Sequence, residues 1–531
     1  MKSVLPGSEE ERKYTRVLLR KLRDTVDWVK VVRFPVYAWS SECGVEINGV
    51  VYDCAALPYS PPVTLDTKPE IVRHAGSRAS SELRDNVVLA KYPESYVELR
   101  WLYYILSKAS TELVVFYTNR DFLKADTVLG TAGLTFNPST LPRVPVICVT
   151  SKVAGLLVKR HATVRVSTRV SSGEALLILA GINGPGESVI HVVGYHDTIL
   201  GDPSKTSSRV LPEIARYLKS RERRASIVLV SSSAREIGDW QFTEYHLAWG
   251  LRYLLELLDA RGELSRVHGA VVLGPIHAAG SLRLVAHPAL REVVLSETRE
   301  LSANVTIDYN HALLESYLYA TKGIPALTAT TLPRTWWYYN STLESQRGDE
   351  DNLVSRLTAR LVNRLAESDY SLLLRELEDY VVKSLGEVGL EIRSVVFRAR
   401  SLSRVLSARD YVREITKLGY TTFYTMCSDP LAINVQSDLL VDLSESAVNS
   451  LRRNLEECRG DLVIGNSDWY VVARAGSLLV EAFLRGYVER TVKNKNTLID
   501  SSIVRFLCER ALKVSSHGVE EHRNRQVREL Q

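Results

Sequence analysis

The spacing of apolar residues divides the first part of the chain into one helix and a series of short strands. Within residues 8–30, apolar residues recur at the spacing of a helix, which predicts an amphipathic helix. Its candidate core positions are Tyr14, Val17, Leu18, Leu22, Val26 and Val29. From about residue 46 to 160 the pattern changes to short apolar runs between turn residues, which predicts a β-rich segment with strands near 86–90, 113–117 and 144–149. Residues 161–185 then predict a hairpin with strands at 163–166 and 175–181.

Buried strands and helices alternate through the middle of the chain. Residues 192–238 contain an apolar strand, a polar loop, a helix near 212–216 and a second apolar strand, and the alternation continues to about residue 367. This order predicts an α/β fold with a doubly wound mixed sheet. Ligands bind such sheets beyond the C-terminal ends of the strands, where we expect Asp197, Glu236 and Asn340 to converge. Helical spacing dominates again beyond residue 368.

Four short motifs in this middle region resemble the co-catalytic zinc aminopeptidase family (peptidase family M28-like), which also contains the glutamate carboxypeptidases and the catalytically silent transferrin receptors. The resemblance rests on a strand end of the G-H-x-D-S type, a helix, a strand end of the A-E-E-x-G type and a G-I-P-A strand followed by Y-H-T-x-x-D. The matching segments are Gly194-Tyr195-His196-Asp197-Thr198, 212–216, Ala234-Arg235-Glu236-Ile237-Gly238, 323–327 and Tyr339-Asn340-Ser341-Thr342-Leu343-Glu344.

The resemblance implies a zinc exopeptidase-like fold with three parts. The peptidase-like α/β domain would comprise residues 1–45 and 161–367, and an inserted protease-associated-like domain would comprise residues 46–160. Residues 368–531 would form a mainly helical domain, which makes the homodimer in the carboxypeptidase and receptor branch. We therefore expect a homodimer through this last region.

The same motifs indicate that the catalytic groups have been replaced. The family holds two zinc ions with two His and three carboxylates, and a further Glu is the general base. Arg235 stands in the general-base position, and a guanidinium cannot accept a proton. Of the ligand positions, only Glu236 is clearly kept. The expected former-site cleft is Tyr195, Asp197, Arg235, Glu236, Pro275, Asn340 and Glu344, with Glu315 in place of the Asp of an S-D-H-x-P-F stretch.

Two functions remain open at this point. The preferred prediction is a pseudo-aminopeptidase without cofactor, which binds a peptide, a small ligand or a protein partner in the former cleft. Arg235 would then pair with a ligand carboxylate or with Glu236 itself. The alternative is an active metallo-aminopeptidase or carboxypeptidase with a rearranged zinc site of His196, Asp202, Glu236 and His277. The aromatic run 336–339 predicts either a wall for a ligand or packing between domains.

Composition narrows partners and location. A chain of 531 residues is too long for one core, and its 67 basic and 62 acidic residues give a net charge of only +5 without a basic block, so no nucleic acid is expected. We expect a cytoplasmic protein, because no apolar run is long enough to cross a bilayer and the first residues lack a signal-peptide core. The two Met and abundant ion-pair partners suit a thermophilic source, in which Cys43 and Cys54 could form a disulfide.

Overall fold

The structure is a computed structural model of the chain, and it describes the residues that form the two sheets and most of their helices. These are residues 3–68, 70–72, 87–94, 99, 102–103, 106–107, 111–128, 141–201, 206–220, 224–238, 248–277, 281–299, 305–308, 315–332, 334–343, 350–385, 408–409, 412–413, 416, 422–425 and 462–467. Most of the predicted helical domain, 368–531, therefore lies outside the described residues. Its described parts include α10 (Tyr370–Leu385) and an antiparallel strand pair, β16 (Thr422–Thr425) and β17 (Leu462–Ser467).

The larger of the two main sheets is mixed and, in the described part of the chain, ten-stranded. Its order is β14 (Val305–Asp308), β13 (Leu282–Ala286), β15 (Ala326–Thr330), β12 (Val267–Leu273), β10 (Val189–Tyr195), β11 (Ser226–Ser232), β9 (Ala162–Ile182), β1 (Trp28–Ile47) and β2 (Val50–Asp53), with β4 (Val63–Thr67) paired to β9. At its centre β10 is parallel to both β11 and β12, and β12 is parallel to β15. The predicted α/β fold with a mixed, doubly wound sheet is confirmed.

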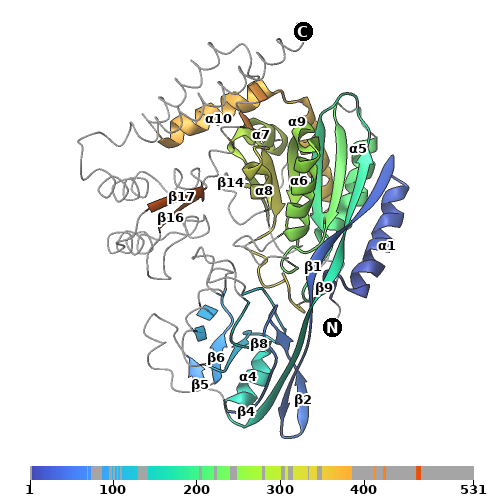
Figure 1. Cartoon of the computed structure of the whole chain (residues 1–531). Helices are drawn as coiled ribbons and strands as arrows, with labels where there is room; N and C mark the ends of the chain where they lie inside the picture. The colour runs from blue at the N-terminus through green and yellow to red at the C-terminus, as the bar shows by residue number, and fades with distance from the viewer. Residues whose placement is uncertain are drawn as a thin grey trace, which may run out of the picture.

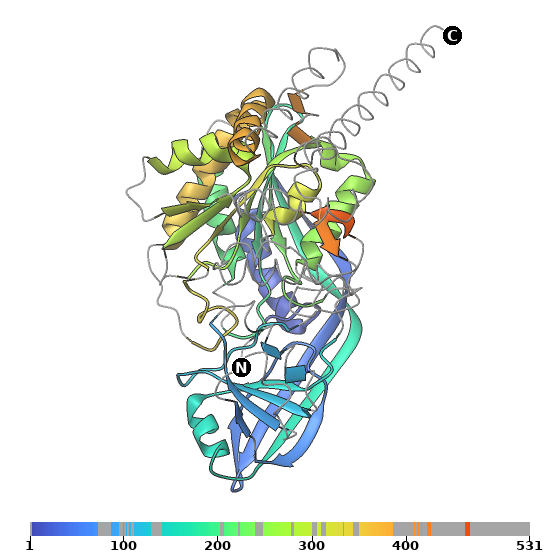
Figure 2. The ribbon, with the colours of Figure 1, turned by 90° about the vertical axis from the view of Figure 1, so that its left-hand side faces the viewer.

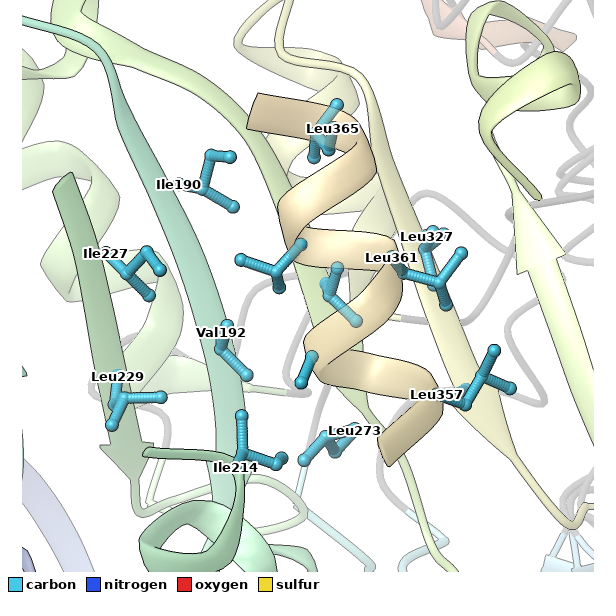
Figure 3. Packing of buried hydrophobic residues seen from close by; sticks show 14 of the residues in the cluster. Ile190, Val192, Ile214, Ile227, Leu229, Leu273, Leu327, Leu357, Leu361 and Leu365 are labelled. Carbon is cyan, nitrogen blue, oxygen red and sulfur yellow. The ribbon is translucent and has the colours of Figure 1, made fainter. Parts of the chain in front are cut away.

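Helices cover both faces of this sheet because the central strands are apolar on both sides. One face packs on α1 (Glu9–Arg23), α5 (Leu211–Lys219), α7 (Arg291–Arg299), α9 (Glu350–Glu367) and α10. The other packs on α6 (Trp249–Ala260) and α8 (Ser316–Thr321). Figure 3 shows Leu357 and Leu361 of α9 beside Leu327 of β15, in the same buried cluster as Ile190 and Val192 of β10. Truncating such a buried Leu to Ala costs about 2–5 kcal/mol, so α9 is firmly attached to the sheet.

The first helix is shorter than predicted. Ser8 caps α1 by accepting a hydrogen bond from the Glu11 backbone N–H, and the helix ends at Arg23. Val26 is buried beyond that end, and Val29 belongs to β1. The prediction of one helix over 8–30 was wrong at its C-terminal end, because pairing with β9 offers these residues a ladder of backbone hydrogen bonds that a longer helix would forgo.

Two long strands connect the large sheet to a smaller one. β1 and β9 pair antiparallel from Trp28 opposite Gly181 to Glu46 opposite Thr163, and the ribbon they form runs from one sheet to the other in both views (Figures 1 and 2). The predicted hairpin over 161–185 was wrong, since β9 is one continuous strand. Its Ser-Ser-Gly sequence at 171–173 suggests a turn but stays extended, because β1 provides a partner along its whole length.

The smaller sheet is built mainly from parallel strands. Its order is β3 (Ala55–Ala56), β8 (Val146–Val149), β7 (Leu113–Tyr117), β6 (Val87–Lys91) and β5 (Glu70–Val72). The four strands β5 to β8 are parallel to one another, whereas β3 is antiparallel to β8. The helix α4 (Ser151–Leu157) packs in the core that this sheet shares with the ribbon. The predicted strand positions are close to those observed, but the parallel pairing was not foreseen. The domain boundaries at 46 and 160 stay a prediction.

A disulfide joins Cys43 of β1 to Cys54, which directly precedes β3. The two cysteines flank the β1–β2 turn, so the pairing considered from the sequence is present in the structure. No helix in the described part of the chain is long and apolar enough to span a membrane.

Candidate functional site

The ends of three central strands and the segment after β15 surround a small pocket of about 40 Å³ that opens to solvent. The predicted cleft residues that line it are Tyr195, Asp197, Arg235, Pro275 and Asn340, together with His277. Glu236 follows Arg235 in the chain and forms an ion pair with it, with 3.2 Å between Arg235 Nη1 and Glu236 Oε1. The predicted convergence of Asp197, Glu236 and Asn340 at the C-terminal strand ends is therefore seen, whereas Glu344 lies outside the described residues.

The backbone after β11 fixes the direction of Arg235. Ala234 has a φ of 58°, in the left-handed region that a non-glycine residue rarely adopts, so the chain turns sharply at the strand end. The Arg235 backbone N–H then donates to Asp197 Oδ2 at 2.8 Å, and its carbonyl accepts from the Ala248 N–H at 2.6 Å. Backbone strain of this kind is common at functional sites, where it positions a side chain.

Arg235 is the centre of a buried ion cluster. Its Nε donates to a Glu315 carboxylate oxygen, and its Nη1 lies 3.2 Å from Glu236 Oε1. The Tyr339 hydroxyl accepts a hydrogen bond from Arg235 Nη1 and donates one to Glu236 Oε1. Arg235 is 8% exposed, Glu236 6% and Glu315 4%, so one guanidinium is shared by two carboxylates almost out of contact with water.

Burial and charge have opposite effects on the groups of this cluster. Burial alone would lower the pKa of Arg235, but Glu315, Tyr339 and Glu236 raise it well above its ordinary value, so the guanidinium is charged. Burial raises the pKa of Glu236 to about 7, against the opposing effect of Arg235. Burial also raises the pKa of Asp197 to about 6 and that of the Tyr195 phenol well above 10. Tyr195 is therefore a neutral phenol at physiological pH.

Several polar atoms of the site have no hydrogen-bond partner among the residues that the structure describes. They are Asp197 Oδ1, Glu236 Oε2, Glu315 Oε2 and the Tyr195 hydroxyl. Buried polar atoms in native proteins are nearly always paired, with protein, water or ligand. The site therefore has spare hydrogen-bonding capacity.

A second buried ion pair lies where the smaller sheet meets the segment after β15. Lys124 Nζ is 2.9 Å from Asp126 Oδ2, and it donates to the carbonyls of Trp336 at 2.8 Å and Tyr339 at 2.6 Å. Asp126 also accepts from the Tyr92 hydroxyl at 2.8 Å and from Asn340 Nδ2 at 3.4 Å. Nothing in the sequence indicated this cluster, because the Trp336 and Tyr339 carbonyls that accept from Lys124 lie more than 200 residues away in the chain.

The aromatic run 336–339 is divided between core packing and the lining of the pocket. Trp336 and Trp337 pack with the core of the smaller sheet, and the Trp336 ring centroid is 3.9 Å from Lys124 Nζ. Tyr338 and Tyr339 line the pocket. Glu315 and Tyr339 are the partners of Arg235 whose importance the sequence left undetermined, and their place in the family motifs was the only signal for them.

The alternative zinc ligands do not come together in the described residues. His196 points away from the pocket: Nδ1 lies 2.8 Å from Ser231 Oγ, and Nε2 lies 3.4 Å from Glu11 Oε1 of α1. This follows from the alternation of side chains at a strand end, because its neighbours Tyr195 and Asp197 face the pocket. His277 does line the pocket, and its backbone N–H donates to Thr331 Oγ1 at 3.0 Å. Asp202 lies outside the described residues.

The fold is that of the zinc aminopeptidases. The structure is similar to a zinc aminopeptidase from Bacillus subtilis with a TM-score of 0.52 and 16% sequence identity, over 68% of this chain and 90% of that one. It is also similar to a peptidase M28 precursor from Shewanella amazonensis with a TM-score of 0.53 and 13% identity, over 69% of this chain and 91% of that one. No protein-family model and no curated protein matches the sequence. Identities this low establish the shared fold alone.

Proposed function

We propose that this chain is a non-catalytic protein with a zinc aminopeptidase fold, and that it binds a peptide, a small ligand or a protein partner in the pocket at the strand ends. The observation that carries the proposal is the position of Arg235. Its guanidinium bonds both Glu236 and Glu315, so a permanent cation of the chain already neutralises the carboxylates of the pocket.

The donor set does not suit a dinuclear zinc centre. Zinc in proteins takes thiolate, imidazole or carboxylate ligands. Tyr195 is a neutral phenol, Pro275 has no side-chain donor, and the Asn340 amide is bonded to Asp126. The described residues contain no group of three or more His, Cys, Asp or Glu side chains that could hold a metal ion. A metal beside Arg235 would also meet the repulsion of a fixed positive charge.

Hydrolysis would also lack a base in the position where the resemblance expects one. Arg235 cannot accept a proton at any physiological pH, and electrostatic attraction to Glu315 and Glu236 makes its protonated form still more stable. Glu236, whose pKa is near 7, is tied to Arg235 and Tyr339 through Oε1. We therefore assign no catalytic residue in this pocket.

The experiment is a peptidase assay on the full chain with aminoacyl and short peptide substrates, in the presence of Zn²⁺, Co²⁺ or Mn²⁺. We expect no turnover above that of buffer, with a zinc aminopeptidase of the same fold as the positive control. Metal-dependent turnover that a chelator abolishes and Glu236→Ala eliminates would instead establish the alternative, an active metallo-exopeptidase.

The proposal includes assembly. The sequence of 368–531 predicts several apolar helical faces, more than the sheet domain needs as cover, and unpaired apolar faces are usually buried against another chain. We expect a two-fold homodimer through residues 368–531. Light scattering should give twice the mass of one chain, and a monomer at micromolar concentration would contradict this part of the proposal.

A further inference from the structure

The pocket presents one unused hydrogen-bond donor group and one unused acceptor from neighbouring residues. Arg235 uses Nε for Glu315 and Nη1 for Glu236 and Tyr339, while its Nη2 makes no hydrogen bond within the described residues. Asp197 Oδ2 accepts from the Arg235 backbone N–H, while Oδ1 has no partner there. Both residues line the pocket, and Asp197 Oδ1 is buried.

These two groups are held in place before any ligand arrives. The Arg235 guanidinium carbon lies 5.0 Å from the ring centroid of Tyr339 and 5.5 Å from that of Tyr195, and two glutamates fix its remaining nitrogens. Asp197 is fixed by the backbone of Arg235 itself. A preorganised donor and acceptor lose little conformational entropy on binding, which favours a small group of matching shape.

Charge balance argues against an anionic ligand. Arg235 is already shared by Glu236 and Glu315, and Asp197 adds a further carboxylate beside it. A ligand carboxylate would bring one more negative charge and would leave Asp197 Oδ1 without a donor. The pairing of Arg235 with a ligand carboxylate, which the sequence suggested, is therefore disfavoured by the surroundings of the guanidinium.

A cationic ligand fits no better. An ammonium group has donors only, so it could satisfy Asp197 Oδ1 but would leave Arg235 Nη2 without an acceptor. It would also place a second cation against the guanidinium. An uncharged group with both an acceptor and a donor preserves the charge balance of the pocket and provides partners for Arg235 Nη2 and Asp197 Oδ1.

We propose that the pocket binds an uncharged carboxamide, whose oxygen accepts from Arg235 Nη2 and whose N–H donates to Asp197 Oδ1. This inference rests on the proposed function and names the chemistry of the ligand. The aromatic and prolyl surfaces of Tyr195, Tyr338, Tyr339 and Pro275 provide apolar contact for the rest of the ligand. The amide comes from a side chain or small molecule if it is primary, and from a peptide main chain if it is secondary.

The test compares four molecules of nearly equal size and different charge: benzamide, N-methylbenzamide, benzoate and benzylammonium. Their affinities for the full chain are measured by NMR titration near neutral pH, where Asp197 is ionised. We expect one of the two amides to bind at least about tenfold more tightly than benzoate and benzylammonium. Tighter binding of benzamide would indicate a primary amide from a side chain or small molecule, and tighter binding of N-methylbenzamide would indicate a peptide main chain.

A single substitution changes the predicted preference. Glu315→Gln removes one of the two charges that balance Arg235, so the ratio of benzoate affinity to benzamide affinity should rise by about tenfold. Glu174→Gln, at an exposed glutamate paired with Arg33, removes the same charge outside the pocket and should leave the ratio unchanged. If Glu315→Gln fails to fold, the wild-type ranking decides alone.

Tighter binding of benzoate or benzylammonium than of both amides, or no binding of any of the four, would overturn the inference. An unchanged ratio in a folded Glu315→Gln variant would overturn it too. A failed ligand inference does not contradict the proposed function, provided that the protein shows no peptidase turnover. Peptidase turnover would contradict the proposed function, whatever the ranking of the four molecules.

Discussion

The molecule contains two buried ion clusters that differ in how many of their polar atoms have hydrogen-bond partners. In the first, Lys124 donates to three acceptors, and both carboxylate oxygens of Asp126 have partners. In the second, Arg235 is shared by Glu236 and Glu315, yet each glutamate keeps one carboxylate oxygen without a partner in the described residues. Both clusters contact the segment 336–340, so they are near neighbours with different tasks.

The difference distinguishes a structural cluster from a candidate binding site. A saturated buried network fixes one conformation, and removing a member leaves the others unpaired. Lys124 and Asp126 fasten the smaller sheet to the segment that carries Tyr339 and Asn340. An unsaturated network beside a pocket has capacity left for a ligand. The first cluster therefore positions one wall of the pocket, and in the proposed function the second provides its recognition groups.

Breaking the saturated cluster should have the largest effect on stability. Lys124→Met leaves Asp126 buried without its counter-ion, which we expect to lower the free energy of unfolding by about 4 kcal/mol. Urea unfolding measures the loss. Lys91→Met, at a half-exposed lysine paired with Glu94, is the matched control and should change stability by less than about 1 kcal/mol.

The double variant Lys124→Met/Asp126→Leu should recover part of the loss, because no unpaired charge remains. If Lys124→Met were as stable as Lys91→Met, the Lys124 cluster would not stabilise the fold.

Breaking the pocket cluster should cost somewhat less. Arg235→Met leaves Glu236 and Glu315 without their cation, but Glu236 can take up a proton near neutral pH, so we expect a loss of about 3 kcal/mol. Thermal and urea unfolding give the value, with Arg33→Met, at an exposed arginine paired with Glu174, as the control. An unchanged stability would mean that the guanidinium does not balance the buried carboxylates.

The raised pKa of Glu236 predicts a smaller effect that depends on pH. Its folded state holds the proton more tightly than the unfolded state, so its contribution to stability is lost as the pH rises from about 4.5 to about 7. Glu236→Gln cannot titrate and should reduce the loss of stability over this range by about 2 kcal/mol relative to wild type.

Urea unfolding at several pH values tests this, and Glu187→Gln, at an exposed glutamate, should follow the wild-type curve. Parallel curves for wild type and Glu236→Gln would contradict the environment assigned to Glu236.

Periodicity predicted the sheet and the place of the pocket, because both follow from short segments of sequence. The strand ends at Tyr195 and Glu236 could be placed in this way, and the pairing of Arg235 with Glu236 follows from their adjacency. The ribbon of β1 and β9 was missed, since antiparallel partners 117 residues apart or more leave no local pattern and the Ser-Ser-Gly sequence suggests a turn. Glu315 and Lys124 were missed as partners for the same reason, because each meets its cluster only through the folded chain.

The central claim is that Arg235 provides the positive charge that the fold otherwise takes from metal. Zinc content measures this most directly, in protein purified without chelator and dialysed against excess Zn²⁺ and then against metal-free buffer. We predict far less than one zinc ion per chain, for wild type and Glu236→Ala alike. Retention of one or two zinc ions per chain by the wild type, with loss in Glu236→Ala, would contradict the claim.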